Sequence, residues 1–347
     1  MIIIGCDLHT RMQQIAMLDS ESGEVTERRL DHEDGEAKSF YAQLKSPARV
    51  GIESTGYTRW FAEMLEELGH ELVVGDAAKI RARETRKQKH DRRDAEHILN
   101  LLVKDDFPKI WLPSAEERDV RVLIEHRHQL VQLRTRAMNG LQAVALNYGL
   151  RLRRGLWTKA GQQQLQKLPL REGPARRRSD LLALIAQINA WVKELEQHIA
   201  EEVMKRPDAQ LLLTHPGVGE LTALVTVLVL GPVERFPGAR QVTSYGGVIP
   251  EEDSSARRQR FGHLTKQGNR LLRFVLVEAG QTACRYDPAL RRTYRRLVFR
   301  KGPAIAKVAI ARKLLIRLYI MLRDKIDYQE FCRRGSHAGM LGDMALA

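Results

Sequence analysis

Four acidic residues stand where they could hold a divalent cation together. Asp7 and Glu53 each directly follow a short apolar run typical of a buried strand. Asp91 and Asp94 are three residues apart on a predicted helix, and such residues share one helix face. Crowding these like charges is unfavourable unless cations lie between them. The pattern therefore predicts a metal site built from carboxylate oxygens.

The chemistry of such a site would be phosphoryl transfer with Mg²⁺ as the cofactor. Mg²⁺ prefers oxygen ligands, and two ions about 3.5 to 4 Å apart can activate an attacking oxygen and stabilise a leaving one. Each acid alone also has a structural interpretation. Asp7 could close a turn, and Glu53 could pair with Arg59. Asp91 and Asp94 could simply begin a helix, where acids are favoured. Their order on strand, strand and helix favours the nuclease-type site.

The pattern of apolar and turn residues over residues 1–104 predicts the strands and helices that would position these acids. Three consecutive strands separated by short turns indicate an antiparallel meander. Later strands alternate with helices, as parallel crossovers require. We therefore expect an α/β domain with a mixed sheet. The predicted strands cover residues 2–6, 14–18, 25–30, 50–52 and 71–74, and the predicted helices cover residues 36–45 and 59–68.

Two long amphipathic helices are predicted within residues 105–206. Apolar side chains recur at spacings of three, four or seven from Leu123 to Tyr148, and again from Leu181 to Val203. Such stripes suit either an antiparallel pair or an oligomeric coiled coil. Residues 151–178 between them are basic and interrupted by glycine and proline, so we predict a loop at the far tip of the pair.

Positive charge dominates the chain and is concentrated toward its C-terminal end. The 57 Lys and Arg residues exceed the 43 Asp and Glu residues, which gives a formal net charge of +14. Between Ala256 and Arg317 the only acids are Glu278 and Asp287, whereas basic residues are frequent. Such clustering suits a phosphate-binding surface, because neutralised phosphates release counterions. Nucleic acid is the leading partner, although ribosomal and membrane-surface proteins share a basic balance.

Two further segments could contact a nucleic-acid backbone. Residues 79–90 are strongly basic and predict a loop or irregular helix that clamps phosphates, or a solvated linker. Pro216-Gly-Val-Gly219 resembles a helix-hairpin-helix turn, whose backbone amides can hold a phosphate. A plain structural turn explains this tetrapeptide equally well. His215 and His263 suit structural roles or phosphate contacts better than the role of a general base.

The cysteines and apolar runs indicate a cytoplasmic protein without a membrane segment. Cys6, Cys284 and Cys332 are far apart, which suits neither a disulfide framework nor a zinc site. The N-terminal apolar run is too short for a secretory signal. The longest apolar run, residues 221–233, is too short to cross a bilayer about 30 Å thick.

Short motifs in the first and last thirds of the chain follow one another in a recognisable order. Those of the first third are Ile4-Gly-Cys-Asp7, Gly51-Ile-Glu-Ser-Thr-Gly-Tyr57 and Lys89-His-Asp-Arg-Arg-Asp94. Those of the last third are Pro216-Gly-Val-Gly219, Phe236-Pro-Gly-Ala-Arg-Gln241, Ser244-Tyr-Gly-Gly-Val-Ile-Pro250 and Leu264-Thr-Lys-Gln-Gly-Asn269. Together they resemble the DEDD transposases of insertion sequences, relatives of the Piv DNA invertase. The middle of the chain matches that family only in its two-helix character.

The resemblance implies an α/β plus α fold in three domains. Residues 1–104 would form an RNase H-like, RuvC-like catalytic domain, residues 105–206 a helical coiled-coil region, and residues 207–347 a mainly helical transposase domain with a serine loop. The acids that would coordinate Mg²⁺ are Asp7, Glu53, Asp91 and Asp94. A serine would form a covalent link to a DNA phosphate. A non-coding bridge RNA would select donor and target DNA, and a homo-oligomer, a dimer or tetramer, would exchange the strands.

The family's serine lies in a Ser-Ser-Gly-Gly-like segment that aligns with Ser254-Ser-Ala-Arg257. Ser255 is the first candidate nucleophile and Ser254 the second. Ala256 and Arg257 replace the family's glycines, which could alter the local backbone. A hydroxyl nucleophile must lose its proton, and its transition state needs nearby positive charge. The candidate nucleic-acid contacts are Arg257, Arg258, Arg260, Lys266 and Arg270.

Three functions compete on the sequence alone. The leading one is a transposase that cuts and rejoins DNA through serine and Mg²⁺ chemistry. A RuvC-like, structure-specific endonuclease for Holliday junctions would hydrolyse DNA with the four acids and without a serine intermediate. A non-catalytic nucleic-acid-binding protein would carry the acids as structural groups. The intact acids and serines argue against the non-catalytic protein.

Overall fold

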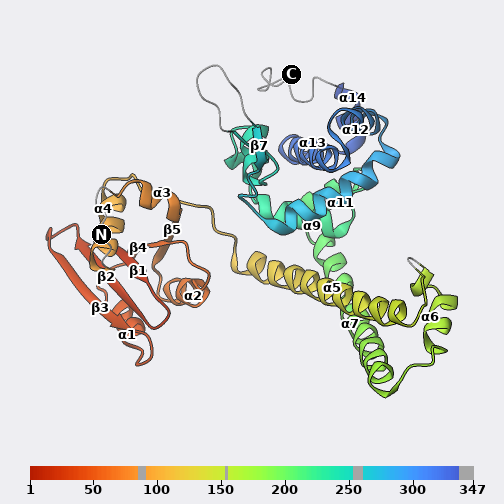
Figure 1. Ribbon diagram of the computed structural model, residues 1–347. Helices are drawn as coiled ribbons and strands as arrows, with labels where there is room; N and C mark the ends of the chain where they lie inside the picture. The colour runs from red at the N-terminus through yellow and green to blue at the C-terminus, as the bar shows by residue number, and fades with distance from the viewer. Residues whose placement is uncertain (85–90, 153–154, 253–260, 336–347) are drawn as a thin grey trace. The chain divides into compact units, whose positions relative to one another are not determined.

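The protein divides into two compact units in a computed structural model that describes residues 1–84, 91–152, 155–252 and 261–335 (Figure 1). The first unit covers Met1–Leu112 and the second covers Pro113–Ala347. Residues 105–112 group with the first unit, in whose core Phe107 is buried. A further division of the second unit near residue 206 stays a prediction.

Among the described residues, the first unit is built on a five-stranded mixed sheet in the order β3-β2-β1-β4-β5. The strands are β1 (Ile2–Leu8), β2 (Met12–Asp19), β3 (Val25–Asp31), β4 (Ala48–Glu53) and β5 (Glu71–Gly75). The first three strands pair antiparallel, and β4 runs parallel to both β1 and β5. The predicted meander followed by parallel crossovers is confirmed.

Helices pack on both faces of this sheet. They are α1 (Glu36–Ala42), α2 (Arg59–Glu67), α3 (Ala77–Ala82) and α4 (Asp91–Val103). Tyr41 of α1 and Phe61 of α2 are buried against one face, and Leu99 of α4 is buried against the other. Side chains alternate between the faces along a strand, so Ile4 joins the first core and Ile3 the second.

Two glycines let the α4 backbone lie directly on the central strands. Gly5 of β1 and Gly51 of β4 are paired in register. A Cβ at Gly5 would come within 2.2 Å of the Ala95 carbonyl oxygen and 2.4 Å of the Leu99 amide nitrogen. A Cβ at Gly51 would come within 2.6 Å of Leu102 Cδ1. The absent side chains therefore set how closely α4 approaches β1 and β4.

The basic segment 79–90 begins as a regular helix. Asp76 caps α3, because its side chain accepts a hydrogen bond from the Lys79 amide at 3.1 Å. Ile80 is buried in the core beneath α4. The loop alternative is therefore wrong for residues 79–82, where burial of one apolar side chain orders a basic stretch. Residues 85–90 lie outside the described residues.

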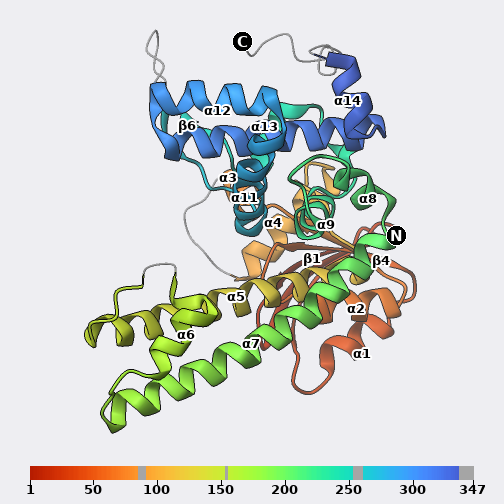
Figure 2. The ribbon, with the colours of Figure 1, turned by 90° about the vertical axis from the view of Figure 1, so that its right-hand side faces the viewer.

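Two long helices open the second unit and run antiparallel (Figure 2). They are α5 (Ala115–Asn147) and α7 (Glu172–Met204). Ile124 of α5 shares a buried cluster with Val203 of α7, and Leu130 shares another with Ile188. The residue numbers of the packed partners therefore rise along α5 as they fall along α7, which confirms the antiparallel pair. An oligomeric coiled coil stays a prediction.

The tip between these helices is itself largely helical. Within the described residues it contains η1 (Gly155–Trp157) and α6 (Lys159–Gln166). Leu156 and Leu165 are buried with Leu141 of α5. The prediction of a loop over residues 151–178 is therefore wrong.

The prediction took glycine and proline as helix breakers, but in this region both residue types lie within helices. Thr158 caps α6 by accepting a hydrogen bond from the Gly161 amide at 3.1 Å. Gly161 lies so close to the Gly155 carbonyl oxygen that a Cβ would come within 2.0 Å of it. Pro174 stands in the first turn of α7, where its missing N–H loses no helical hydrogen bond.

Helices also build the rest of the second unit around one large core. The elements are α8 (Pro207–Leu213), α9 (Glu220–Leu230), η2 (Val233–Arg235), α10 (Ala239–Tyr245), β6 (Pro250–Glu252), β7 (Phe261–Leu264), α11 (Arg270–Tyr286), α12 (Pro288–Lys301), α13 (Pro303–Asp324) and α14 (Tyr328–Arg334). Leu224, Leu276 and Leu315 from three of these helices share the core with Ile124 and Val203 of the helix pair. In the described ranges, no helix is long and apolar enough to cross a membrane.

The tetrapeptide Pro216-Gly-Val-Gly219 connects α8 to α9 and packs into this unit. Gly217 has a φ of 89°, and a Cβ there would lie 2.4 Å from the Ala283 amide nitrogen of α11. His215 is buried, and its Nδ1 lies 3.0 Å from the Pro216 carbonyl oxygen. These contacts favour the structural interpretation of both the turn and His215.

Candidate metal site

Two adjacent strands present acids to the same face of the sheet. The parallel pairing of β1 with β4 extends to the residues immediately before Asp7 and Glu53. Side chains two residues apart in a strand share a face. Gly5 and Gly51 face α4, so Asp7 and Glu53, two residues later, face α4 as well. The predicted adjacency of the two strands is confirmed, and the joint role of Asp7 and Glu53 as ligands stays a prediction.

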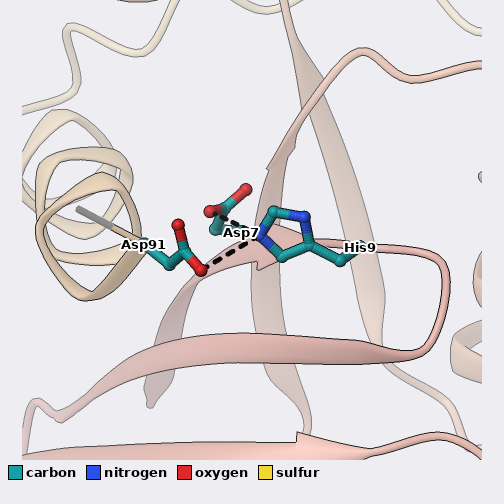
Figure 3. A group of neighbouring side chains, drawn as sticks. All are labelled: Asp7, His9 and Asp91. Carbon is teal, nitrogen blue, oxygen red and sulfur yellow. Dashed lines mark hydrogen bonds and ion pairs between the residues drawn. The ribbon is translucent and has the colours of Figure 1, made fainter. Parts of the chain in front are cut away.

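Asp7, His9 and Asp91 come together where α4 begins (Figure 3). His9 Nε2 lies 3.1 Å from Asp7 Oδ2 and 3.6 Å from Asp91 Oδ2. One possible ligand atom from each residue lies within 4.8 Å of the other two. The group thus offers two carboxylate oxygens and one imidazole nitrogen from β1, the turn after it and the N-terminus of α4.

Burial and like charge make Asp7 harder to ionise. Burial raises the pKa of the Asp7 carboxyl most strongly, His9 lowers it, and the charges of Asp94 and Asp91 raise it further. The net effect is a pKa above the ordinary value. Asp94 therefore acts electrostatically on Asp7 although it lies outside the close group. A divalent cation beside Asp7 would offset this repulsion, so the residues present fit such an ion.

Glu53 lies nearby with a cationic partner of its own. Its Oε1 is 3.4 Å from Nη2 of Arg81, which belongs to α3. Arg59, the partner suggested by the sequence, donates to Glu63 at 2.8 Å. Among the described residues, the close metal-ligand group contains neither Glu53 nor Asp94.

Sequence reasoning missed His9 as a member of this group. A signal was present, because His9 follows Asp7 by two positions and alternate residues of an extended segment share a face. Imidazole nitrogen is a common ligand for transition metals, whereas Mg²⁺ is held mainly by oxygen. If His9 binds the ion, its nitrogen would make the site more favourable for transition-metal ions than the carboxylates alone would.

Comparisons with known proteins point to one family. A family model for DEDD transposases of the IS110 type, described as a transposase, matches residues 4–149. A second model, described as the Transposase IS116/IS110/IS902 family, matches residues 209–295. The chain belongs to the DEDD transposase family of insertion sequences. The predicted resemblance is confirmed.

Relatives of similar length match nearly the whole DEDD transposase chain. The "Probable family 20 transposase" of Pseudomonas aeruginosa is 26% identical over 338 residues, which cover 94% of this chain and 98% of the relative. The transposase for insertion sequence element IS1111A of Coxiella burnetii is 24% identical over 340 residues, which cover 94% of this chain and 91% of the relative. The likeness therefore extends through residues 150–208, which contain α7 and lie between the two matched regions.

The region matched by the DEDD transposase model includes every residue of the candidate metal site. Asp7, Glu53, Asp91 and Asp94 all lie within residues 4–149, and His9 does too. Family membership favours a divalent metal ion at this site. The role of each acid as a ligand stays a prediction.

The second matched region includes the predicted nucleophile and nucleic-acid contacts. Ser254, Ser255, Arg257, Arg258 and Arg260 lie outside the described residues. The strands on either side of them, β6 and β7, pair antiparallel. Lys266 and Arg270 are exposed, and Arg270 begins α11. Their exposure is compatible with phosphate contacts, and these contacts stay a prediction for both residues.

Proposed function

We propose that this DEDD transposase cuts and rejoins the DNA strands of an insertion sequence by metal-assisted phosphoryl transfer in an RNase H-like N-terminal domain. The observation that carries the proposal is the convergence of Asp7 and Asp91 beside β1. Glu53 shares their face of the sheet, and Asp94 lies in the same first turn of α4. Carboxylates placed in this way repel one another, and a cation would make their proximity favourable.

Mg²⁺ is the ion proposed for this site. It would stabilise charge on the attacking and leaving oxygens of the phosphodiester. Asp7 and Asp91 would supply oxygen ligands from two different elements. His9 Nε2, which lies 3.1 Å from Asp7 Oδ2, would supply a nitrogen ligand beside these oxygens. The close docking of α4 on Gly5 would keep Asp91 at a constant distance from Asp7.

Ser255 is the proposed nucleophile, with Ser254 as the alternative. The serine oxygen would form a bond to phosphorus as the bond to the leaving deoxyribose oxygen breaks, and the serine proton would pass to solvent. Attack by a strand-end hydroxyl would then break the serine–phosphorus bond and rejoin the DNA. Arg257, Arg258 and Arg260 would neutralise the phosphate. The order of the C-terminal motifs supports this assignment.

Donor and target DNA are the proposed substrates, a bridge RNA is the proposed guide, and a homo-oligomer is the proposed active form. The net charge of +14 supports a polyanionic partner. If a guide is bound, the purified protein should carry one discrete RNA species. Full site-selective activity in a preparation free of nucleic acid would contradict the guide.

Trapping of covalent protein–DNA adducts tests the serine chemistry. With Mg²⁺ and labelled element-end DNA, the wild-type protein should give an adduct that survives denaturing electrophoresis. Ser255→Ala should abolish the adduct, and Ser254→Ala, the matched control, should retain it. Asp91→Asn should abolish both cleavage and adduct, because the acids act before the link can form.

The same assay separates the competing functions. Efficient cleavage by wild-type protein without any adduct would support a RuvC-like structure-specific nuclease. DNA binding without cleavage or joining, unaffected by Mg²⁺ and by Asp91→Asn, would support a non-catalytic nucleic-acid-binding protein.

A further inference from the structure

Helix α12 has one face in the core of the second unit. Leu290 is buried with Cys284 of α11 and Ile310 of α13, and Tyr294, one turn later, packs against the same cluster. α12 and α13 lie side by side in Figure 2. These contacts define the inner side of α12 and leave its opposite side in solvent.

The solvent side of α12 carries an aromatic ring among arginines. Phe299 is 93% exposed. Arg292, Arg295 and Arg296 precede it by seven, four and three residues and are also exposed. These spacings place all four side chains on one side of the helix. We call this set of four residues the Phe299 face.

The Phe299 face carries uncompensated positive charge. Among the described residues, no carboxylate pairs with its three arginines. Asp287, the acid at the start of α12, is already bound by Arg317. On the neighbouring helix, burial lowers the pKa of Lys313, and the charges of Arg317 and Arg296 lower it further. The positive field of the face therefore extends onto α13.

Such a face is unfavourable in the isolated protein. A phenyl ring in water gains no burial energy, and like charges one helical turn apart repel each other. A membrane-binding helix would present a broad apolar side, whereas this face has one apolar side chain among three cations. The same face of a second copy would place arginine against arginine. A polyanion that also carries flat apolar groups matches both features.

We propose that the Phe299 face binds an unpaired segment of a DNA strand, with a base stacked on Phe299 and phosphates against the arginines. The inference rests on the proposed function, in which DNA is the substrate. Bases within a duplex are already stacked on their neighbours, so the ring is accessible only to an unpaired base. Cutting and exchanging strands produces such segments.

Oligonucleotides that differ only in their bases test this face. Full-length protein would be titrated with a labelled single-stranded DNA, with a strand of equal length made of abasic sites, and with the corresponding duplex. Phe299→Ala should weaken binding of the single strand about tenfold, the order of effect for one lost base stack. Binding of the abasic strand and the duplex should change less than about twofold, because those ligands never used the ring.

Matched variants separate stacking from charge and from general loss of apolar surface. Phe299→Trp should retain binding, and Phe299→Leu should behave like Phe299→Ala. Arg296→Ala should weaken all three ligands and reduce the salt slope by about one. Met204→Ala, which removes another exposed apolar side chain that is 69% exposed, should change nothing.

Several results would overturn the inference. Equal effects of Phe299→Ala on base-containing and abasic strands would exclude stacking. A tenfold preference of the face for RNA of the same sequence would exclude DNA as its ligand. Phe299→Ala could instead leave single-strand binding unaltered while it abolishes binding to anionic vesicles or changes the oligomeric state. Either result would assign the Phe299 face to another partner. Wild-type protein that binds no DNA at all would instead contradict the proposed function itself.

Discussion

A single methyl group added at Gly5 should displace α4 and, with it, the ligand that α4 supplies. In Gly5→Ala the new Cβ would lie 2.2 Å from the Ala95 carbonyl oxygen and 2.4 Å from the Leu99 amide nitrogen. Both are backbone atoms of α4, so no change of rotamer can relieve the overlap. Ordinary non-bonded contacts are about 3.5 Å, and the helix must therefore retreat from β1 by roughly 1 Å.

The energetic cost follows from the same contacts. Overpacking typically costs about 1 to 3 kcal/mol, and backbone overlap places Gly5→Ala at the upper end or beyond. A loss of about 3 kcal/mol should lower the melting temperature of the first unit by roughly 12 °C. Gly51→Ala should cost less, because its Cβ meets the end of the Leu102 side chain at 2.6 Å, which can rotate away. Gly56→Ala is the matched control, since a Cβ there has no neighbour within 4 Å.

Calorimetry and metal titration would test this graded expectation. Melting temperatures should fall in the order Gly56→Ala, Gly51→Ala, Gly5→Ala. Mn²⁺ binding, followed by electron paramagnetic resonance, should weaken in Gly5→Ala because Asp91 retreats from its partners. If Gly5→Ala matched Gly56→Ala in both stability and Mn²⁺ affinity, the close docking of α4 on β1 would be refuted.

Three further outcomes are expected from single substitutions. Asp7→Asn removes a crowded charge, so the metal-free first unit should be at least as stable as wild type in thermal unfolding. Added Mg²⁺ should no longer raise the melting temperature of this variant. A surviving Mg²⁺ effect would exclude Asp7 as a ligand. His9→Asn should weaken Mn²⁺ binding about tenfold and Mg²⁺ binding much less, and equal losses would argue against a nitrogen ligand. Burial, with the charge of Arg317, lowers the pKa of His215 from 6.5 to about 4. The unfolded chain therefore takes up this proton first as the pH falls, and the free energy of unfolding should drop by about 3 kcal/mol between pH 6.5 and about pH 4. Urea titrations of His215→Phe should show a flatter dependence of this free energy on pH. An unchanged dependence would contradict the lowered pKa of His215.

Local sequence pattern predicted most of the sheet unit. Each strand combines apolar residues with adjacent turn residues, and β1 to β5 lie within a few residues of the predicted ranges. The same reasoning failed at the tip of the helix pair. Gly161 lies inside α6 because the helix packs against the Gly155 carbonyl oxygen, and that contact is invisible in a list of residue types.

The candidate site was predictable in its acids but not in its contacts. Asp7, Glu53, Asp91 and Asp94 were identifiable by residue type and by their places on strands and a helix. The pairing of Glu53 with Arg81 required the fold to bring together two side chains that are 28 residues apart in the sequence.

The sequence by itself determined which groups can bind cations or phosphates, the approximate order of strands and helices, and the family. Only the tertiary structure decided that Asp7, His9 and Asp91 share one small volume while Glu53 is paired with an arginine. The physical reason is that strand register and the docking of α4 on Gly5 and Gly51 depend on packing between distant segments. No local window of residues contains those contacts.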